Sequence, residues 1–251
     1  MNKLVVTMNI NDYAPAITKL TMPYMKRYAK RIGADFHVIS ERLRPEYNID
    51  YEKFQLWDLS KDYDYTLFFD ADALILPGFY DLTTKYGENE VFNPCPDVAS
   101  TRFLVDNYFR RDGRDIGVGA WCVCCTNRTR DIWHPTKLTQ SEINERITPN
   151  LVEQNFGYES EHFICDYLCS RNVAKYGLKV KTFNDVVRPE FNKLLVHVYL
   201  DNLYRKEVFL RETIKVSKKF SKSVFAKNNV LADDIDEQLS KKVPEFKIKL
   251  F

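Results

Sequence analysis

The sequence of 251 residues lacks any long hydrophobic run and any marked excess of one charge. No segment approaches the roughly 18 apolar residues that a membrane-spanning helix needs. The apolar run near the N-terminus is too short for the core of a signal peptide. Lysine and arginine total 37 against 35 acidic residues, and a net charge of +2 gives no electrostatic reason to expect a nucleic-acid partner. We therefore expect a soluble, cytoplasmic protein.

Without a secretory signal, the six cysteines are expected to be reduced thiols rather than a disulfide framework. Cys122 and Cys125 form a C-x-x-C pair, and Cys165 with Cys169 offers a second pair that zinc could use. The segment 121–125 has the composition of a buried strand, however, and the second pair is separated by three residues rather than two. These features favour buried structural thiols over a zinc site.

Strand-like and helix-like segments alternate along the first 70 residues. β-branched and aromatic runs predict strands, whereas apolar residues at three- and four-residue steps predict helices. The expected order is strand 4–8, helix 17–32, strand 36–39, helix 54–59 and strand 65–69. This alternation predicts an α/β fold with parallel strands, helices on both faces and ligands bound beyond the carboxyl ends of the strands.

Other segments complete this expected architecture. Residues 9–12 combine turn-forming residues with a good N-cap for the first helix, and Pro23 is expected to kink or restart that helix. Further segments predict strands at 119–125, 180–183 and 194–199 and a helix at 164–174.

The positive charge is concentrated near the C-terminus. Residues 206–251 hold 11 basic and 7 acidic residues, whereas residues 1–205 hold 26 and 28. The apolar positions Val208, Phe209 and Ile214 suggest a helical segment that packs only in part on the rest of the protein. We expect one α/β domain over residues 1–205 and a basic helical extension over residues 206–251, for which contact with an acidic membrane surface is an open alternative to a solvated helical face.

The stretch TLFFDADALIL, residues 66–76, places Asp70 and Asp72 directly after an apolar strand. Two acids separated by one residue on an extended segment point to the same side, where they repel each other unless a cation lies between them. Magnesium or manganese would bind their oxygens and keep positions open for a substrate phosphate. The simpler alternative is that the aspartates cap a turn.

A D-x-D pair fits more than one class of protein. In a sugar transferase, the metal held by the pair neutralises the diphosphate that leaves. In a phosphatase of the haloacid-dehalogenase type, Asp70 would be the nucleophile and Asp72 the general acid. That class carries its motif on the first strand, whereas two strands precede it here, and its late acidic motif would have to be Asp233 and Asp234 in the lysine-rich tail. A non-catalytic module that binds a nucleotide sugar is a third alternative.

Several blocks together resemble glycosyltransferases of the GT-A fold, and in particular the glycogenin-like, family 8-type transferases. The first block combines the strand ending in Thr7 with Asn11 and Tyr13. The resemblance implies that these three side chains surround the uracil and ribose of a UDP-sugar. Without the family, Tyr13 is equally well explained as a packed aromatic residue near the start of a helix.

The second block is Lys53, four residues before Trp57, followed by the strand that ends in the D-x-D pair. The resemblance gives Lys53 a contact with the diphosphate or the donor sugar, for which a compact ammonium is suited. A solvated lysine on a helix face is the alternative.

The third block, Glu161 to Asp166, resembles the family's segment at a helix start facing the donor sugar. The resemblance implies that Glu161 and Asp166 orient the donor, stabilise the transition state or act as general base. A helix-dipole role for Glu161 and a surface position for Asp166 are the alternatives. In the family a histidine of the last core strand completes the metal site, and His197 matches it; without the family, a lone histidine on an apolar run is a core residue.

The resemblance has gaps. Leu200 and Leu203 stand where the family has glycine and lysine, although Arg205 and Lys206 follow and could serve the diphosphate. The stereochemical outcome therefore stays open.

The resemblance implies a GT-A, Rossmann-like, mostly parallel mixed sheet flanked by helices. The expected activity is transfer of a sugar, dependent on Mn²⁺ or Mg²⁺, from a nucleotide diphosphate sugar to a hydroxyl of a glycan or glycoprotein acceptor.

Overall fold

The computed structural model describes residues 1–94, 117–153, 163–182, 185, 194–197 and 203–223. Its centre is a six-stranded sheet in the order β2-β1-β3-β6-β5-β7. The strands are β1 (Lys3–Met8), β2 (Asp35–Ile39), β3 (Tyr65–Phe69), β5 (Glu90–Phe92), β6 (Cys122–Thr126) and β7 (Lys179–Lys181).

The sheet is mixed and mostly parallel, as the sequence predicts. Strand β1 pairs in parallel with both β2 and β3, and β5 pairs in parallel with β7. Strand β6 lies between β3 and β5 and runs antiparallel to both. A separate pair, β4 (Leu74–Ile75) and β8 (Leu195–Val196), is antiparallel and carries the chain on from β3. The predicted strands at 180–183 and 194–199 are shorter in the described residues than expected.

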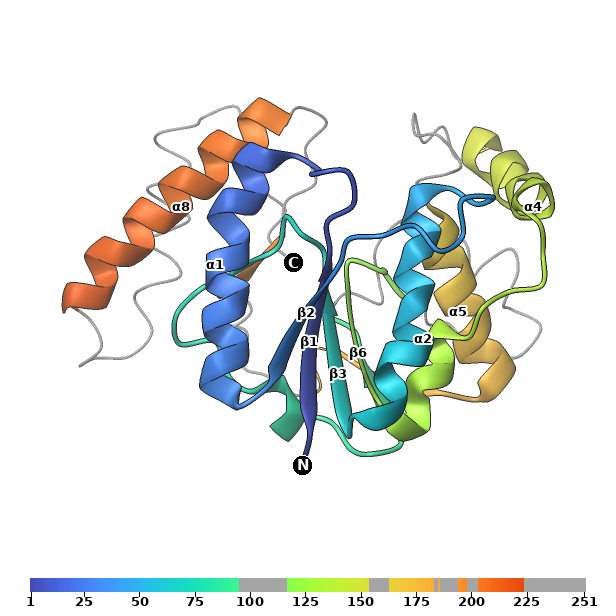
Figure 1. Cartoon of the computed structure of the whole chain (residues 1–251), viewed down its shortest axis with the longest axis horizontal. Helices are drawn as coiled ribbons and strands as arrows, with labels where there is room; N and C mark the ends of the chain where they lie inside the picture. Colours follow the sequence, from blue (N-terminus) through green and yellow to red (C-terminus); the bar gives the residue numbers. More distant parts are fainter. Residues whose placement is uncertain (95–116, 154–162, 183–184, 186–193, 198–202, 224–251) are drawn as a thin grey trace.

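Helices cover both faces of the sheet (Figure 1). On one side lie α1 (Pro15–Ile32) and α8 (Leu203–Ser223), together with the short 3₁₀ helix η3 (Leu82–Thr84). On the other side lie η1 (Ile49–Gln55), α2 (Leu56–Leu59), η2 (Ser60–Asp62), η6 (Asn127–Trp133), α4 (Gln140–Glu153) and α5 (Ile164–Tyr176). The predicted helix over 54–59 therefore begins as a 3₁₀ helix and becomes α-helical only at Leu56.

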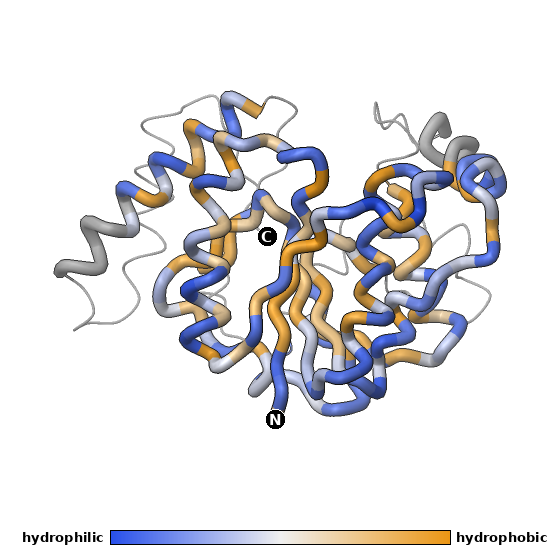
Figure 2. Tube along the Cα trace, viewed as in Figure 1, coloured by the Kyte–Doolittle hydropathy of each residue, from blue (hydrophilic) through white to orange (hydrophobic). Residues whose placement is uncertain are grey.

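Alternate residues of the central strands supply two separate cores. Val5, Leu67 and Phe69 face α1 and the β4–β8 pair, whereas Val6 and Phe68 face α2, η6 and α5. This is the period of two that a strand imposes on its side chains. Figure 2 shows hydrophobic residues gathered along these central strands and hydrophilic residues interspersed along α1 and α8. The two cores hold both faces of β1 and β3, and the ends of these strands are fixed as a result.

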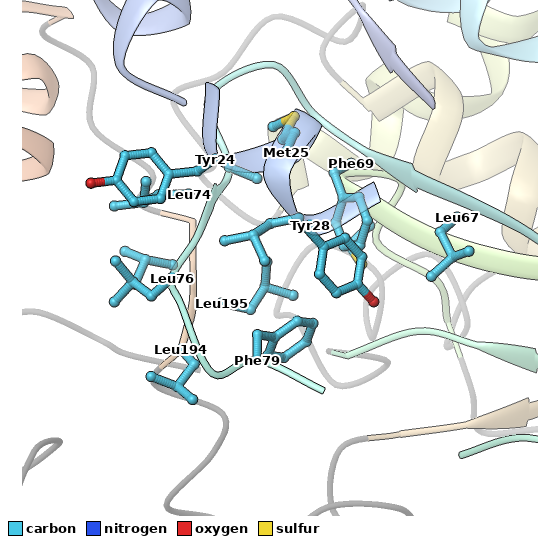
Figure 3. Packing of buried hydrophobic residues seen from close by; sticks show 14 of the residues in the cluster. Tyr24, Met25, Tyr28, Leu67, Phe69, Leu74, Leu76, Phe79, Leu194 and Leu195 are labelled. Atoms are coloured by element: carbon cyan, nitrogen blue, oxygen red, sulfur yellow. The ribbon is translucent and has the colours of Figure 1, made fainter. Parts of the chain in front are cut away.

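Aromatic and aliphatic side chains pack together in the core beneath α1 (Figure 3). The ring of Tyr28 on α1 lies edge-on to Phe69 of β3, with centroids 6.0 Å apart, and 5.7 Å from the ring of Phe79. The hydroxyl of Tyr28 accepts a hydrogen bond from the backbone N–H of Leu82. Burial raises the pKa of Tyr28 well above its usual value, so this side chain stays neutral.

The start of α1 differs from the expected one. The helix begins at Pro15 after Ala14, whose φ is 44° and whose side chain makes no capping hydrogen bond. Asn11 and Asp12 have φ values of 55° and 50°, which are left-handed conformations that these two residue types tolerate well. They form the turn after β1 instead of capping the helix, and Pro15 presets the first helical residue. The helix is continuous through Pro23, so the expected restart at this residue is wrong.

Helix α8 packs beside α1 and begins at Leu203. Phe209, Leu210 and Ile214 are buried in the same core as α1 and β4. None of the described helices is both long and apolar enough to cross a membrane. The domain boundary at residue 205 stays a prediction, and residues 224–251 of the expected extension lie outside the described residues.

We expect the packing of α8 to contribute strongly to stability. The Phe209→Ala substitution removes a fully buried ring and should lower the free energy of unfolding by about 3–5 kcal/mol. The exposed Lys215→Ala on the same helix should change it by less than about 0.5 kcal/mol. Urea unfolding of the two variants makes the comparison, and equal effects would show that α8 is not part of the cooperative fold.

Candidate functional site

Asp70 and Asp72 lie in a tight turn at the carboxyl end of β3, not on an extended segment as the sequence suggested. The backbone N–H of Ala73 donates to the carbonyl of Asp70 at 2.9 Å, which closes the turn. The backbone N–H of Asp70 donates to the carbonyl of Trp121 at 2.8 Å, and the hydroxyl of Thr21 donates to the carbonyl of Ala71. The turn is therefore held by hydrogen bonds from two other segments.

Asp70 has a buried lysine as its partner. Nζ of Lys53, from η1, lies 2.7 Å from Oδ1 of Asp70, and only 8% of the Lys53 side chain is exposed. The ammonium also lies 5.5 Å from the ring centroid of Phe68. Burial opposes its charge, but Asp70 and Asp50 outweigh burial and hold the pKa of Lys53 well above its usual value. Lys53 is therefore a fixed positive charge beside the carboxylate pair.

Asp72 is buried between His197 and Lys206. The antiparallel register of β4 and β8 pairs Leu74 with Val196, which brings His197 next to the turn. Nε2 of His197 lies 3.2 Å from Oδ1 of Asp72, and Nζ of Lys206 on α8 donates to Oδ2. Burial alone would raise the pKa of Asp72, but His197 and Lys206 lower it far below its usual range. Asp72 is therefore ionised.

Trp121 fixes the orientation of the histidine. Its indole ring is stacked on the imidazole of His197 at a centroid distance of 4.6 Å and an angle of 9°. Its carbonyl is the group that accepts from the backbone of Asp70. Trp121 therefore contacts both ends of the group formed by Asp70, Asp72 and His197.

These three residues have the donor atoms of a metal site. Asp70, Asp72 and His197 each offer one ligand atom, and all of these atoms lie within 4.8 Å of one another. Oδ1 of Asp72 is buried, and although Nε2 of His197 lies 3.2 Å away, the pair does not have the geometry of a hydrogen bond, so this oxygen has no hydrogen-bond partner among the described residues. A cation beside His197 would satisfy this oxygen. Two carboxylates and one imidazole suit Mn²⁺ or Mg²⁺, so the residues present fit the expected metal.

Residues at the end of β1 and in the turn that follows it lie at the same edge of the sheet. Thr7 is fully buried, and neither its Oγ1 nor Oδ1 of Asn9 has a hydrogen-bond partner among the described residues. Tyr13 is 48% exposed, and burial of part of its ring together with the nearby Asp72 and Asp70 raises its pKa to about 12. Tyr13 therefore lies beside the carboxylate pair, whereas Asn11 is exposed in the preceding turn.

Asp166 lies in the first turn of α5 and contacts the segment that carries Trp121. Its Oδ1 accepts a hydrogen bond of 2.7 Å from the backbone N–H of Ala120. Burial raises the pKa of Asp166 to about 7, and the nearby Lys53 lowers it only in part. Asp166 therefore lies close enough to Lys53 for the charge of the ammonium to act on its carboxyl group. Glu161, the other expected catalytic carboxylate, lies outside the described residues.

The remaining residues of interest have structural partners. Nε1 of Trp57 donates to Asp131 at 3.0 Å, and Arg130 lies over its ring. The five described cysteines are buried, as the sequence predicts, and form no disulfide with one another; they are Cys122, Cys124, Cys125, Cys165 and Cys169. Among the described residues, these cysteines do not form a metal-binding group.

Sequence reasoning missed two residues of this site and gave a third a different partner. Trp121 was part of a predicted strand, and Asn9 was part of a turn. Lys206 was considered for a diphosphate, whereas in the structure it contacts Asp72. No spacing signal links Lys206 to Asp72, because they are 134 residues apart in the chain.

Comparison with known proteins gives structural matches alone. No protein-family model matches the sequence. No curated protein matches it either. The chain is similar to a solved glycosyltransferase involved in the glycosylation of the major capsid of PBCV-1, with 13% identity over 84% of this chain and 99% of that one and a TM-score of 0.47.

Two further solved structures belong to galactosyltransferases. The galactosyltransferase LgtC, solved with donor and acceptor sugar analogues, is 15% identical over 81% of this chain and 82% of its own, with a TM-score of 0.41. A Drosophila β1,4-galactosyltransferase 7 mutant, solved with manganese, UDP-Gal and xylobiose, is 16% identical over 82% of this chain and 74% of its own, with a TM-score of 0.39. All three of these solved proteins are glycosyltransferases.

The raised pKa of Asp166 predicts a pH-dependent stability. Between its usual value of 3.8 and about 7, folded Asp166 holds a proton that the unfolded chain has lost, so the unfolding free energy falls as pH rises through this range. The Asp166→Asn variant keeps an oxygen for Ala120 but cannot titrate. Relative to this variant, the wild type should lose up to about 2 kcal/mol between pH 5 and pH 7.

Urea unfolding at several pH values, with EDTA present, measures this difference. Other titrating groups contribute equally to both proteins and cancel in the comparison. Parallel pH profiles for wild type and Asp166→Asn would contradict the assigned shift.

Proposed function

We propose that the protein is a metal-dependent glycosyltransferase that moves a sugar from a nucleotide diphosphate sugar to an acceptor hydroxyl. The supporting observation is the group of Asp70, Asp72 and His197 at the carboxyl edge of the sheet, where open α/β folds bind ligands. A UDP-sugar is the proposed donor, and the acceptor is a glycan or a protein-linked sugar.

The proposed metal is Mn²⁺ or Mg²⁺, held by Asp70, Asp72 and His197. When bound, it would supply Lewis-acid stabilisation of the diphosphate leaving group. Trp121, stacked on His197, orients the imidazole for this role. The proximity of His197 to Asp72 favours a metal-holding pair over the phosphatase alternative, in which Asp70 would be a nucleophile and Asp72 an acid.

The donor would be recognised by residues of β1 and η1. The buried hydroxyl of Thr7, at the end of β1, has no hydrogen-bond partner in the part of the chain that the structure describes, and Asn11 follows in the turn. Tyr13 has an exposed ring beside the carboxylate pair and is the proposed stacking partner of the base. Lys53 is the proposed contact to the diphosphate or the donor sugar, since it is a fixed ammonium next to Asp70.

Asp166 is the proposed group at the reacting centre, together with Glu161. A carboxylate whose pKa is about 7 can both accept and release a proton near neutral pH, as a general base must. Asp166 would then accept the proton of the acceptor hydroxyl, or orient the donor if the transfer retains configuration. The cytoplasmic location and a contact of residues 206–251 with a membrane surface stay predictions from the sequence.

Neutral isosteres of the metal-binding pair should abolish activity. Asp70→Asn and Asp72→Asn keep the side-chain shape but remove a metal-binding charge, so we expect loss of more than about 100-fold in metal-dependent release of UDP from UDP-sugars. UDP release across a panel of UDP-sugars with MnCl₂ measures this effect. Circular dichroism checks that both variants are folded, and full activity of either variant would refute the metal site.

Binding of the donor should require the metal. With UDP and Mn²⁺ each at about 100 times its dissociation constant, stabilisation of about 2.7 kcal/mol or more is expected, which raises the melting temperature by several degrees. Thermal-shift assays compare UDP, Mn²⁺, both together, and AMP with Mn²⁺ as the nucleotide control. An absence of any shift with UDP and Mn²⁺ would contradict the proposed function.

A further inference from the structure

The carboxylate pair is already charge-balanced by two lysines. Lys53 lies 2.7 Å from Oδ1 of Asp70, and Lys206 donates to Oδ2 of Asp72. Both lysines are buried, with 8% and 7% of their side chains exposed. Two negative charges thus face two positive ones within a poorly solvated site.

A divalent cation would disturb this balance. A cation bound to Asp72 would lie close to the ammonium of Lys206, and like charges in a buried site repel each other strongly. While Oδ2 of Asp72 accepts a hydrogen bond from Lys206, this oxygen is not free to coordinate a cation as a second ligand atom. The ammonium on Oδ2 and a cation on Oδ1 therefore compete for the charge of the same carboxylate.

We propose that Lys206 is an internal counter-ion of Asp72 that competes with the metal and must leave the carboxylate when the metal binds. The proposal rests on the proposed function, since it requires that Asp70, Asp72 and His197 hold a cation. It assigns Lys206 a positioning role: its ammonium donates to Oδ2 of the buried Asp72 and holds this side chain in place while no metal is bound.

The part that moves is the lysine side chain, not helix α8. Phe209 and Leu210 follow Lys206 on the same helix and are fully buried in the core shared with α1. They anchor the helix, whereas the four-carbon stem of Lys206 has freely rotatable bonds. A displaced ammonium next to a bound cation leaves an excess of positive charge, which an anionic nucleoside diphosphate would offset. Metal and diphosphate should therefore strengthen each other's binding, and Lys206 contributes to this coupling.

The test is Mn²⁺ binding without turnover. Electron paramagnetic resonance counts free Mn²⁺ in titrations of the wild type, Lys206→Met and Lys206→Gln, with and without UDP. Both variants remove the competing charge, and Lys206→Gln keeps a neutral donor for Asp72 in case the methionine variant folds poorly. Lys215→Met is the matched control, because Lys215 lies on the same helix, has an exposed side chain and forms an ion pair with Glu212.

Without UDP, we expect both Lys206 variants to bind Mn²⁺ about tenfold more tightly than the wild type, and Lys215→Met to bind like the wild type. The factor by which UDP tightens Mn²⁺ binding should be smaller in the Lys206 variants. The melting temperature of Lys206→Met should be lower than that of the wild type in EDTA, and this difference should shrink with Mn²⁺.

Two results would overturn the proposal in distinguishable ways. If the wild type binds Mn²⁺ and the Lys206 variants bind it equally or more weakly, Lys206 does not compete with the metal, and the proposed function stands. If neither the wild type nor the variants bind Mn²⁺, with or without UDP, the metal site itself fails and the proposed function fails with it.

Discussion

The placement of two like charges at a buried edge of the sheet is the constraint on which the site depends. Asp70 and Asp72 follow a buried, mostly apolar strand, and an unpaired charge at such a position is costly. Each carboxylate has a cationic partner from a distant part of the chain, Lys53 for Asp70 and Lys206 for Asp72. Removing one partner of a buried pair leaves the other uncompensated. The pair therefore ties η1 and α8 to the end of β3.

The rigidity of this arrangement comes from the packing on both faces of the sheet. Val5 and Phe69 pack towards α1, while Val6 and Phe68 pack towards α2 and α5. Because both faces are filled, the carboxyl end of β3 cannot shift without disturbing two cores. The β4–β8 pair continues from this fixed end and delivers His197 to Asp72. The site is built where strands end but is held by the cores behind it.

Much of this fold could be predicted because its signals are local. The apolar runs at 4–8, 36–39 and 65–69 predict strands that the structure contains almost residue for residue. Local conformations that depend on contacts with other segments were not predictable. The backbone N–H of Asp70, at the start of the turn, donates to the carbonyl of Trp121 on a distant segment, and the start of α1 is set by Pro15. A pair such as Asp72 and Lys206 joins residues far apart in the chain, and periodicity carries no information about it. His197 was expected only through the family resemblance.

The two carboxylates of the site differ in how far their side chains are exposed to solvent. The side chain of Asp70 is 24% exposed, whereas that of Asp72 is 10% exposed between His197 and Lys206. The side chain of Tyr13 is about half exposed, and it lies close enough to both aspartates for their charges to contribute to its raised pKa. A ligand entering from solvent therefore reaches Asp70 and Tyr13 first, while Asp72 remains shielded by protein groups. In the proposed function, Asp72 would therefore anchor the cation, and Asp70 would share that cation with the substrate.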